Sequence, residues 1–80
     1  MNSDAVYTQL TPIFHDVFDD EGLQLTPQLS ADDVDDWDSL MHVRLILAIE
    51  QKFGIKFSAA EVGRLKNVGD LVQLIAAKTS

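Results

Sequence analysis

The sequence predicts a small all-α protein, a four-helix bundle made of three main helices and one short helix. Three observations support this fold class. Apolar residues recur at spacings of three and four along several stretches, helix-capping residues precede these stretches, and no stretch shows the alternating pattern of a half-buried strand. At 80 residues the chain is long enough for one small core, so we expect a single domain over residues 1–80.

The first helix is predicted over about residues 4–20. Its apolar positions follow the helical repeat and are Val6, Leu10, Ile13, Phe14, Val17 and Phe18. Pro12 interrupts this stretch. Because proline lacks a backbone N–H and clashes with the preceding turn, we expect a kink or a new helix start at this position.

The second helix is predicted from about residue 38 to residue 53, ending before Gly54. Its apolar residues cover more than one face; they are Leu40, Met41, Val43, Leu45, Ile46, Leu47, Ala48, Ile49 and Phe53. A surface helix needs an apolar stripe only about 100° wide. Either this helix is central and contacts all the others, or some of these side chains stay exposed as a docking face. The pattern leaves both interpretations open, and both could hold for different residues.

Two further helices are predicted in the last third of the chain. Ser58 and Glu61 have the spacing of a capping box and begin a short helix that Gly63 limits. Asn67 is a further cap, and a last helix continues to about residue 78. The segment over residues 21–38 is long for a loop, so we expect it to be functional or held in place by its own apolar residues.

The net charge of −7 is unevenly distributed. Residues 1–38 contain ten acidic residues and neither Lys nor Arg, whereas residues 39–80 contain three acidic and six basic residues. This acidity disfavours nucleic acid and anionic lipid as partners and favours proteins with basic patches. There is no cysteine, no signal-peptide pattern and no apolar stretch of about 20 residues. We therefore expect a soluble, monomeric, cytoplasmic protein without disulfides, thiolate metal sites or membrane insertion.

The sequence does not fit a calcium-binding loop or a serine catalytic site. A calcium loop starting at Asp33 would need Gly at its sixth position and Glu at its twelfth, but Asp38 and Arg44 stand there. Ser39 and His42 are three residues apart and could approach each other on a helix. Serine catalysis also needs an oriented base, an oxyanion hole and a substrate pocket, none of which is recognisable in so short a chain. We predict that the protein is not an enzyme and binds no metal.

Ser39 lies at the predicted start of the second helix, between acidic residues and an apolar segment. A serine there is most simply a helix cap. Asp36 and Asp38 can perform that task, however, and also complement the helix dipole. The Ser39 hydroxyl would then remain exposed and available for modification.

These residues resemble the phosphopantetheine-binding acyl carrier proteins. The resemblance rests on Asp38-Ser39-Leu40 followed by MHVRLILAIEQKFGIKF, and it continues through the capped third helix and KNVGDLVQLI. It covers nearly the whole chain and implies a fold like that of these carriers. It also implies that a phosphopantetheinyl transferase joins phosphopantetheine from coenzyme A to the Ser39 oxygen. The thiol of that arm would carry acyl or aminoacyl intermediates as thioesters between a loading ligase or transferase and downstream biosynthetic enzymes.

The resemblance further implies a partner-recognition surface next to the attachment serine. Its residues would be Asp36, Trp37, Leu40, Met41, Val43, Arg44, Leu47 and Glu50. Deeper apolar residues would build the core or line a space for the acyl chain; these are Ile46, Phe53, Ile55, Leu71 and Ile75.

Two departures from the family pattern favour a specialised carrier. Fatty-acid carriers typically have acidic residues two and five positions after the serine, where this chain has Met41 and Arg44. Trp37 stands where many such carriers have a small residue, and a WDS-type motif is more similar to specialised freestanding carriers. We therefore expect a dedicated fatty-acid-like, polyketide-like or other specialised pathway. The alternative is a small helical adaptor that binds a partner through the same helix, with Ser39 only a helix cap.

Overall fold

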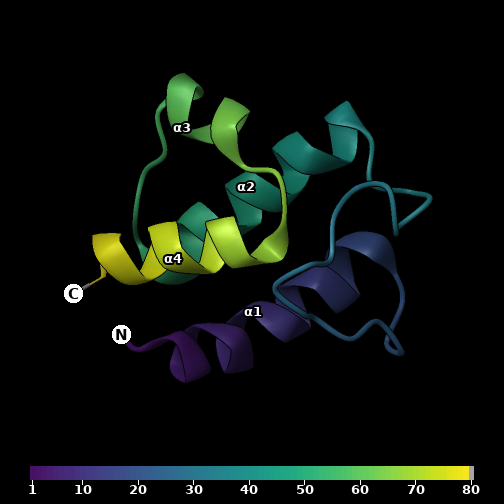
Figure 1. The fold of residues 1–80 in the computed structure, drawn as a ribbon, viewed down its shortest axis with the longest axis horizontal. Helices are drawn as coiled ribbons and strands as arrows, with labels where there is room; N and C mark the ends of the chain where they lie inside the picture. Colours follow the sequence, from purple (N-terminus) through teal and green to yellow (C-terminus); the bar gives the residue numbers. More distant parts are fainter. Residues whose placement is uncertain (80) are drawn as a thin grey trace.

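The protein was studied as a computed structural model that describes residues 1–79. This part of the chain contains four helices and no strand (Figure 1): α1 (Ser3–Phe18), α2 (Ser39–Phe53), α3 (Ala59–Arg64) and α4 (Val68–Lys78). The predicted all-α fold with three main helices and one short helix is confirmed.

The helices α2, α3 and α4 begin at capping residues that the sequence indicates. The side chains of Asp38, Ser58 and Asn67 accept hydrogen bonds from backbone N–H groups in the first turns of α2, α3 and α4. Gly54 ends α2 in the left-handed conformation, with φ of 66°. Asp19 adopts the same conformation after α1, with φ of 51°, so this helix ends two residues earlier than predicted.

No new helix begins at Pro12, and this part of the prediction is wrong. α1 is continuous through Pro12. Leu10, Ile13 and Phe14 on either side of it are buried in the same core. Burying each of these side chains contributes about 1.5–3 kcal/mol. Together they offset the cost of about 3 kcal/mol that proline imposes inside a helix.

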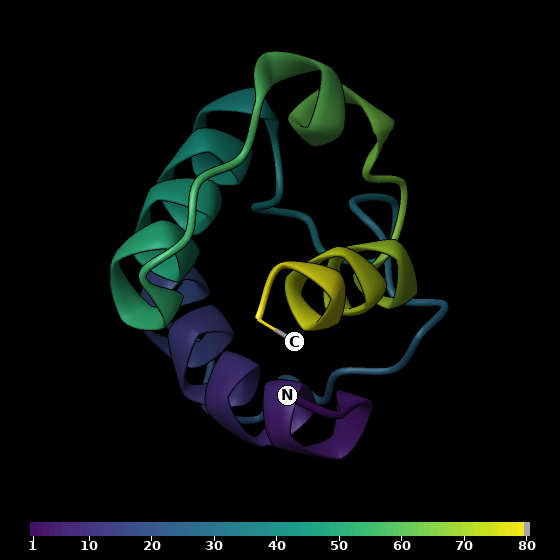
Figure 2. The same cartoon turned by 90° about the vertical axis from the view of Figure 1, so that its left-hand side faces the viewer.

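α1 makes the main helix–helix contacts, with α2 and with α4. Figure 2 shows α2, α1 and α4 around a shared interior, with α3 at the top of the view. The buried core consists of Val6, Leu10, Ile13, Phe14, Phe18, Trp37, Leu45, Ile46, Ile49, Val68, Leu71, Val72 and Ile75. The wide apolar distribution on α2 therefore does not come from a position at the centre of the bundle.

The long segment between α1 and α2 is held against α4. The backbone N–H groups of Val68 and Gly69, at the start of α4, donate to the carbonyls of Leu29 at 2.9 Å and Pro27 at 3.0 Å. His15 Nε2 donates to the Leu23 carbonyl at 2.8 Å. Partly buried leucine and valine side chains of this segment also pack on the core, as expected; they are Leu23, Leu25, Leu29 and Val34. The segment therefore delivers Trp37 and Asp38 to a fixed place at the start of α2.

Candidate functional site

Ser39 is the first residue of α2, and Asp38 is the residue that caps the helix. The Asp38 carboxylate accepts a hydrogen bond from the Met41 N–H at 2.9 Å. The Ser39 side chain is exposed, and its hydroxyl makes no hydrogen bond to any other group within residues 1–79. Capping is thus performed by Asp38, and the Ser39 oxygen points to solvent without a structural partner. Asp36 is exposed in the preceding turn and does not cap the helix.

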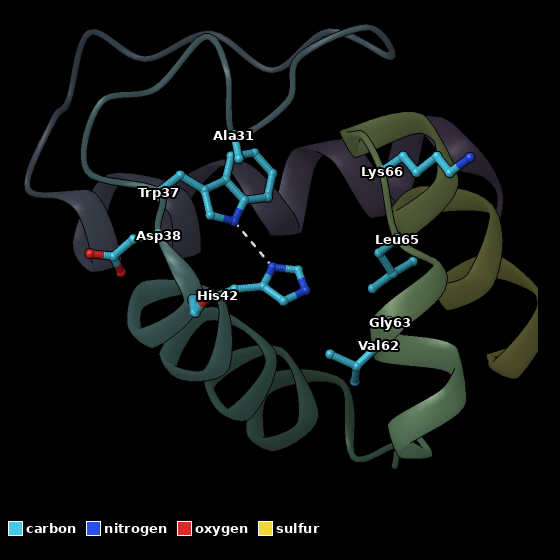
Figure 3. A pocket seen from close by; sticks show the side chains of 9 residues that line it. Ala31, Trp37, Asp38, His42, Val62, Gly63, Leu65 and Lys66 are labelled. Carbon is cyan, nitrogen blue, oxygen red and sulfur yellow. Dashed lines mark hydrogen bonds between the residues drawn. The ribbon is translucent and has the colours of Figure 1, made fainter.

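A pocket with a volume of about 390 Å³ opens beside Ser39. Its walls come from the α1–α2 segment, the start of α2, α3 and the residues that follow α3 (Figure 3). The lining residues are Ala31, Trp37, Asp38, Ser39, His42, Val62, Gly63, Leu65 and Lys66. The attachment serine predicted from the sequence therefore lies at the edge of a groove between α2 and α3.

Trp37 forms one side of this groove from within the core. Its side chain is only 8% exposed. Its ring lies edge-on to Phe14, with 5.5 Å between the ring centroids. The centroid of the Phe18 ring lies 5.7 Å away. Trp37 was predicted as part of the recognition surface, but its side chain is packed inside. Any contribution that it makes to partner recognition would come from fixing the chain beside Asp38.

His42 is a site residue whose interactions the sequence reasoning missed. The Trp37 indole Nε1–H donates to His42 Nδ1 at 3.1 Å, and the two rings stack at 25° with centroids 6.1 Å apart. A buried tryptophan usually finds a partner for its N–H. The rule points to His42 only once Trp37 is known to be buried, and the sequence placed Trp37 on the surface.

Three predicted recognition residues form an exposed apolar face on α2. The side chains of Leu40, Val43 and Leu47 are 63%, 53% and 53% exposed. Their spacing of three and then four residues places them on one face of the helix. Arg44 is also exposed. On the opposite side, Leu45, Ile46 and Ile49 are buried against the core, so α2 both packs inward and keeps apolar side chains outside.

Two other predicted recognition residues have structural contacts. Met41 is partly buried and packs against the core. The Glu50 carboxylate accepts a hydrogen bond from the Phe57 N–H at 2.8 Å, which ties the segment after α2 to that helix. Of the residues expected in the core or around an acyl chain, Ile46, Leu71 and Ile75 are buried and Phe53 and Ile55 are partly buried. None of these five lines the groove beside Ser39.

Within residues 1–79, no group of His, Asp or Glu side chains is arranged to hold a metal ion. No helix in this range is long and apolar enough to cross a bilayer.

Comparisons with known proteins agree with this geometry. Residues 9–75 match the protein family described as "Phosphopantetheine attachment site". An acyl carrier protein from Acidothermus cellulolyticus is 35% identical over 79 residues, covering 99% of this chain and 94% of the relative. One from Helicobacter pylori is 33% identical over 73 residues, covering 89% of this chain and 91% of the relative. The solution structure of holo acyl carrier protein from Geobacter metallireducens has a TM-score of 0.87 and 49% identity, covering 91% of this chain and 84% of that chain.

Proposed function

The chain belongs to the acyl carrier proteins of the phosphopantetheine-attachment family, and from this membership we propose that Ser39 is the residue to which its phosphopantetheine is joined. Acyl carrier proteins hold a covalent phosphopantetheine group and act as carriers rather than catalysts. The observation that supports Ser39 most directly is its exposed hydroxyl, which has no hydrogen-bond partner within residues 1–79 while Asp38 caps the helix.

The residues around Ser39 fit this group. The hydroxyl lies beside a groove with apolar walls from Val62 and Leu65, so an attached arm can lie along it or swing clear. A phosphopantetheinyl transferase would join the Ser39 oxygen to the β-phosphorus of coenzyme A. The new P–O bond replaces the pyrophosphate bond, adenosine bisphosphate leaves, and the hydroxyl proton passes to the transferase. Attached in this way, the group supplies a thiol that holds acyl or aminoacyl cargo.

The attachment is tested by coexpression with a broad-specificity phosphopantetheinyl transferase, followed by intact-mass measurement. We expect a gain of one phosphopantetheinyl group that is lost in Ser39→Ala. Ser3→Ala is the matched control, because Ser3 is likewise exposed and is the first residue of a helix that its neighbour, Asn2, caps. The Ser3→Ala variant should gain the same mass as the protein without a substitution. A gain that survives Ser39→Ala would refute the assignment.

We further propose that this carrier serves a dedicated pathway rather than the general synthesis of fatty acids. Arg44 is exposed on α2 beside the apolar face of Leu40, Val43 and Leu47. Glu50 is engaged with the Phe57 N–H and is only partly exposed. The surface after Ser39 is therefore apolar and basic. Some enzymes use a basic patch to bind acidic residues on the helix of their carrier. On this surface such a patch would meet the positive charge of Arg44.

This second proposal is tested with purified fatty-acid synthase enzymes. We expect them to elongate acyl chains on this protein about tenfold more slowly than on their own carrier, a factor that corresponds to about 1.4 kcal/mol. Arg44→Glu should recover part of the difference. Lys52→Glu makes the same charge change near the far end of α2 and should have little effect. Equal elongation rates on the two carriers would overturn the proposal.

A further inference from the structure

The hydrogen bond between Trp37 and His42 can run in only one direction. An indole nitrogen can only donate, so His42 Nδ1 must accept in the contact at 3.1 Å. In a neutral imidazole one ring nitrogen accepts and the other bears the proton. The His42 proton is therefore on Nε2. Because Trp37 is buried and packed against Phe14 and Phe18, it holds both this tautomer and the orientation of the ring.

The other ring nitrogen of His42, Nε2, points into the groove. Figure 3 shows the His42 ring extending from α2 into the groove, with Nε2 on the side turned toward Val62 and Leu65. The Asp38 carboxylate points away from the groove in the same view. No group within residues 1–79 accepts a hydrogen bond from His42 Nε2. The chain thus places a fixed, unused N–H donor in a partly apolar groove that also reaches Ser39.

We propose that the His42 Nε2–H donates a hydrogen bond to an amide carbonyl of the phosphopantetheine arm and so holds the arm in the groove between α2 and α3. This inference rests on the proposed attachment at Ser39. His42 is a positioning residue, and Trp37 acts through it by fixing the tautomer. In the free protein the Nε2–H is open to water, because no buried side-chain polar atom within residues 1–79 lacks a partner. An arm carbonyl that enters the groove would replace this water as the acceptor, and the orientation that Trp37 fixes would aim the donor at it.

The position of the donor favours an amide carbonyl over the phosphate. The phosphate is bonded directly to Ser39 on α2, whereas Nε2 lies on the side of the ring that faces the opposite wall, toward Val62 and Leu65. The amide groups lie farther along the arm and can cross the groove. They are also part of the arm itself, so the contact should not depend on which cargo the thiol holds.

The test uses protein labelled with nitrogen-15 at histidine and long-range proton–nitrogen spectra recorded with the rings neutral. In the unmodified protein we expect His42 to be protonated at Nε2. After arm attachment, we expect its Hε2 to shift and to exchange with water about tenfold more slowly, the factor for a hydrogen bond of ordinary strength. His15 is the internal control, because its Nε2 already donates to the Leu23 carbonyl and its signals should not change.

Variants of His42 and Trp37 test whether His42 positions the arm or only supports the fold. His42→Phe keeps an aromatic ring without the donor, and it should abolish nuclear Overhauser contacts between the arm and the methyl groups of Val62 and Leu65. His42→Gln restores a terminal N–H donor and should recover part of these contacts. Trp37→Phe should leave a mixture of His42 tautomers and weaken the same contacts. Arm contacts that persist at full strength in His42→Phe would refute the positioning role.

The outcomes distinguish this inference from the function on which it rests. If intact mass shows no arm on Ser39, the attachment proposal fails first. If the arm is attached but the His42 signals do not change, the attachment proposal stands and the inference is overturned. A change that occurs only after an acyl group is loaded would place the acceptor on the cargo, and this also overturns it. Protonation of His42 at Nδ1 in the unmodified protein would do the same.

Discussion

Asp38 and Ser39 are neighbours with separate tasks at the start of α2. The Asp38 carboxylate caps the helix through the Met41 N–H, and the Ser39 hydroxyl has no hydrogen bond within residues 1–79. Stability therefore depends on the aspartate, whereas the proposed modification depends on the serine. This division leaves the serine free for a transferase without loosening the helix that presents it.

The division predicts unequal costs for two alanine substitutions. Asp38→Ala should lower the free energy of unfolding by about 1 kcal/mol, because the first turn of α2 loses its cap. Ser39→Ala should change it by less than about 0.5 kcal/mol, as for an exposed residue without special contacts. Urea unfolding followed by circular dichroism measures both. Equal losses for the two variants would show that Ser39 shares the cap.

The position of the α1–α2 segment depends on the start of α4. A Cβ built on Gly69 would lie 3.1 Å from the Pro27 carbonyl oxygen and 3.2 Å from the Pro27 Cβ. Gly69 also donates its N–H to that same carbonyl at 3.0 Å. A side chain at this position would push the segment away from the hydrogen bond that holds it.

Gly69→Ala should therefore lower the free energy of unfolding by about 1 kcal/mol, because the overpacking cost exceeds the gain in helix propensity. Gly63→Ala is the matched control, since a Cβ there meets nothing within 4 Å inside α3. That variant should be neutral or stabilising by about 0.5–1 kcal/mol. Chemical denaturation of both proteins provides the comparison. A loss for Gly63→Ala as large as that for Gly69→Ala would contradict this explanation.

The short helix α3 has a pH-dependent contact at its first turn. The Ser58 backbone N–H, and then the Lys78 ammonium at 3.1 Å, hold the pKa of the Glu61 carboxyl below its ordinary value. A carboxyl with a lower pKa in the folded state adds stability above its unfolded pKa. That contribution is lost as the pH falls through the folded pKa.

Glu61→Gln should thus be less stable than the protein without the substitution at neutral pH. The difference in stability between the two should disappear at acidic pH, below the ordinary glutamate pKa. Glutamine can keep the capping-box hydrogen bond, so the variant isolates the charge. Thermal unfolding of both proteins across pH measures the difference. Lys78→Gln should reproduce only part of it. A difference that stays constant down to acidic pH would rule out the charge as its source.

Across the molecule, contacts between residues close in sequence were predictable, and contacts between residues distant in sequence were not. The Ser58–Glu61 capping box, the Asn67 cap and the Gly54 stop were all expected, because each depends on residues within one turn. The continuity of α1 through Pro12 and the docking of Pro27 on Gly69 depend on packing between distant segments. Such contacts leave no local pattern in the sequence.

The candidate site likewise has a part that the sequence predicts and a part that it does not. Ser39 was predicted from its motif, and its exposure agrees with that prediction. The groove beside it requires Val62 and Leu65 from α3 and its end, which no spacing near Ser39 indicates. The Trp37–His42 hydrogen bond was missed because it depends on the burial of Trp37 among aromatic residues from α1.

Five acidic residues of the first half of the chain gather at one end of the fold. One surface hollow is lined by residues from the end of α1 and from the segment before α2; its acidic members are Asp19, Asp20, Asp33, Asp35 and Asp36. The whole chain has a net charge of −7. Repulsion among these carboxylates should destabilise the folded state, and added salt should screen that repulsion. The same charge would attract a partner with a basic patch.

Removing one charge from this cluster should therefore stabilise the protein at low ionic strength. Asp35→Asn should raise the free energy of unfolding by about 0.5 kcal/mol in dilute buffer, and the gain should vanish near 1 M salt, where the screening length is about 3 Å. Asp4→Asn removes the same charge from the first turn of α1, where an acid complements the helix dipole. That control should be destabilising at low salt. If both variants shift stability in the same direction, position within the fold does not decide the effect, and repulsion within the cluster is not its cause.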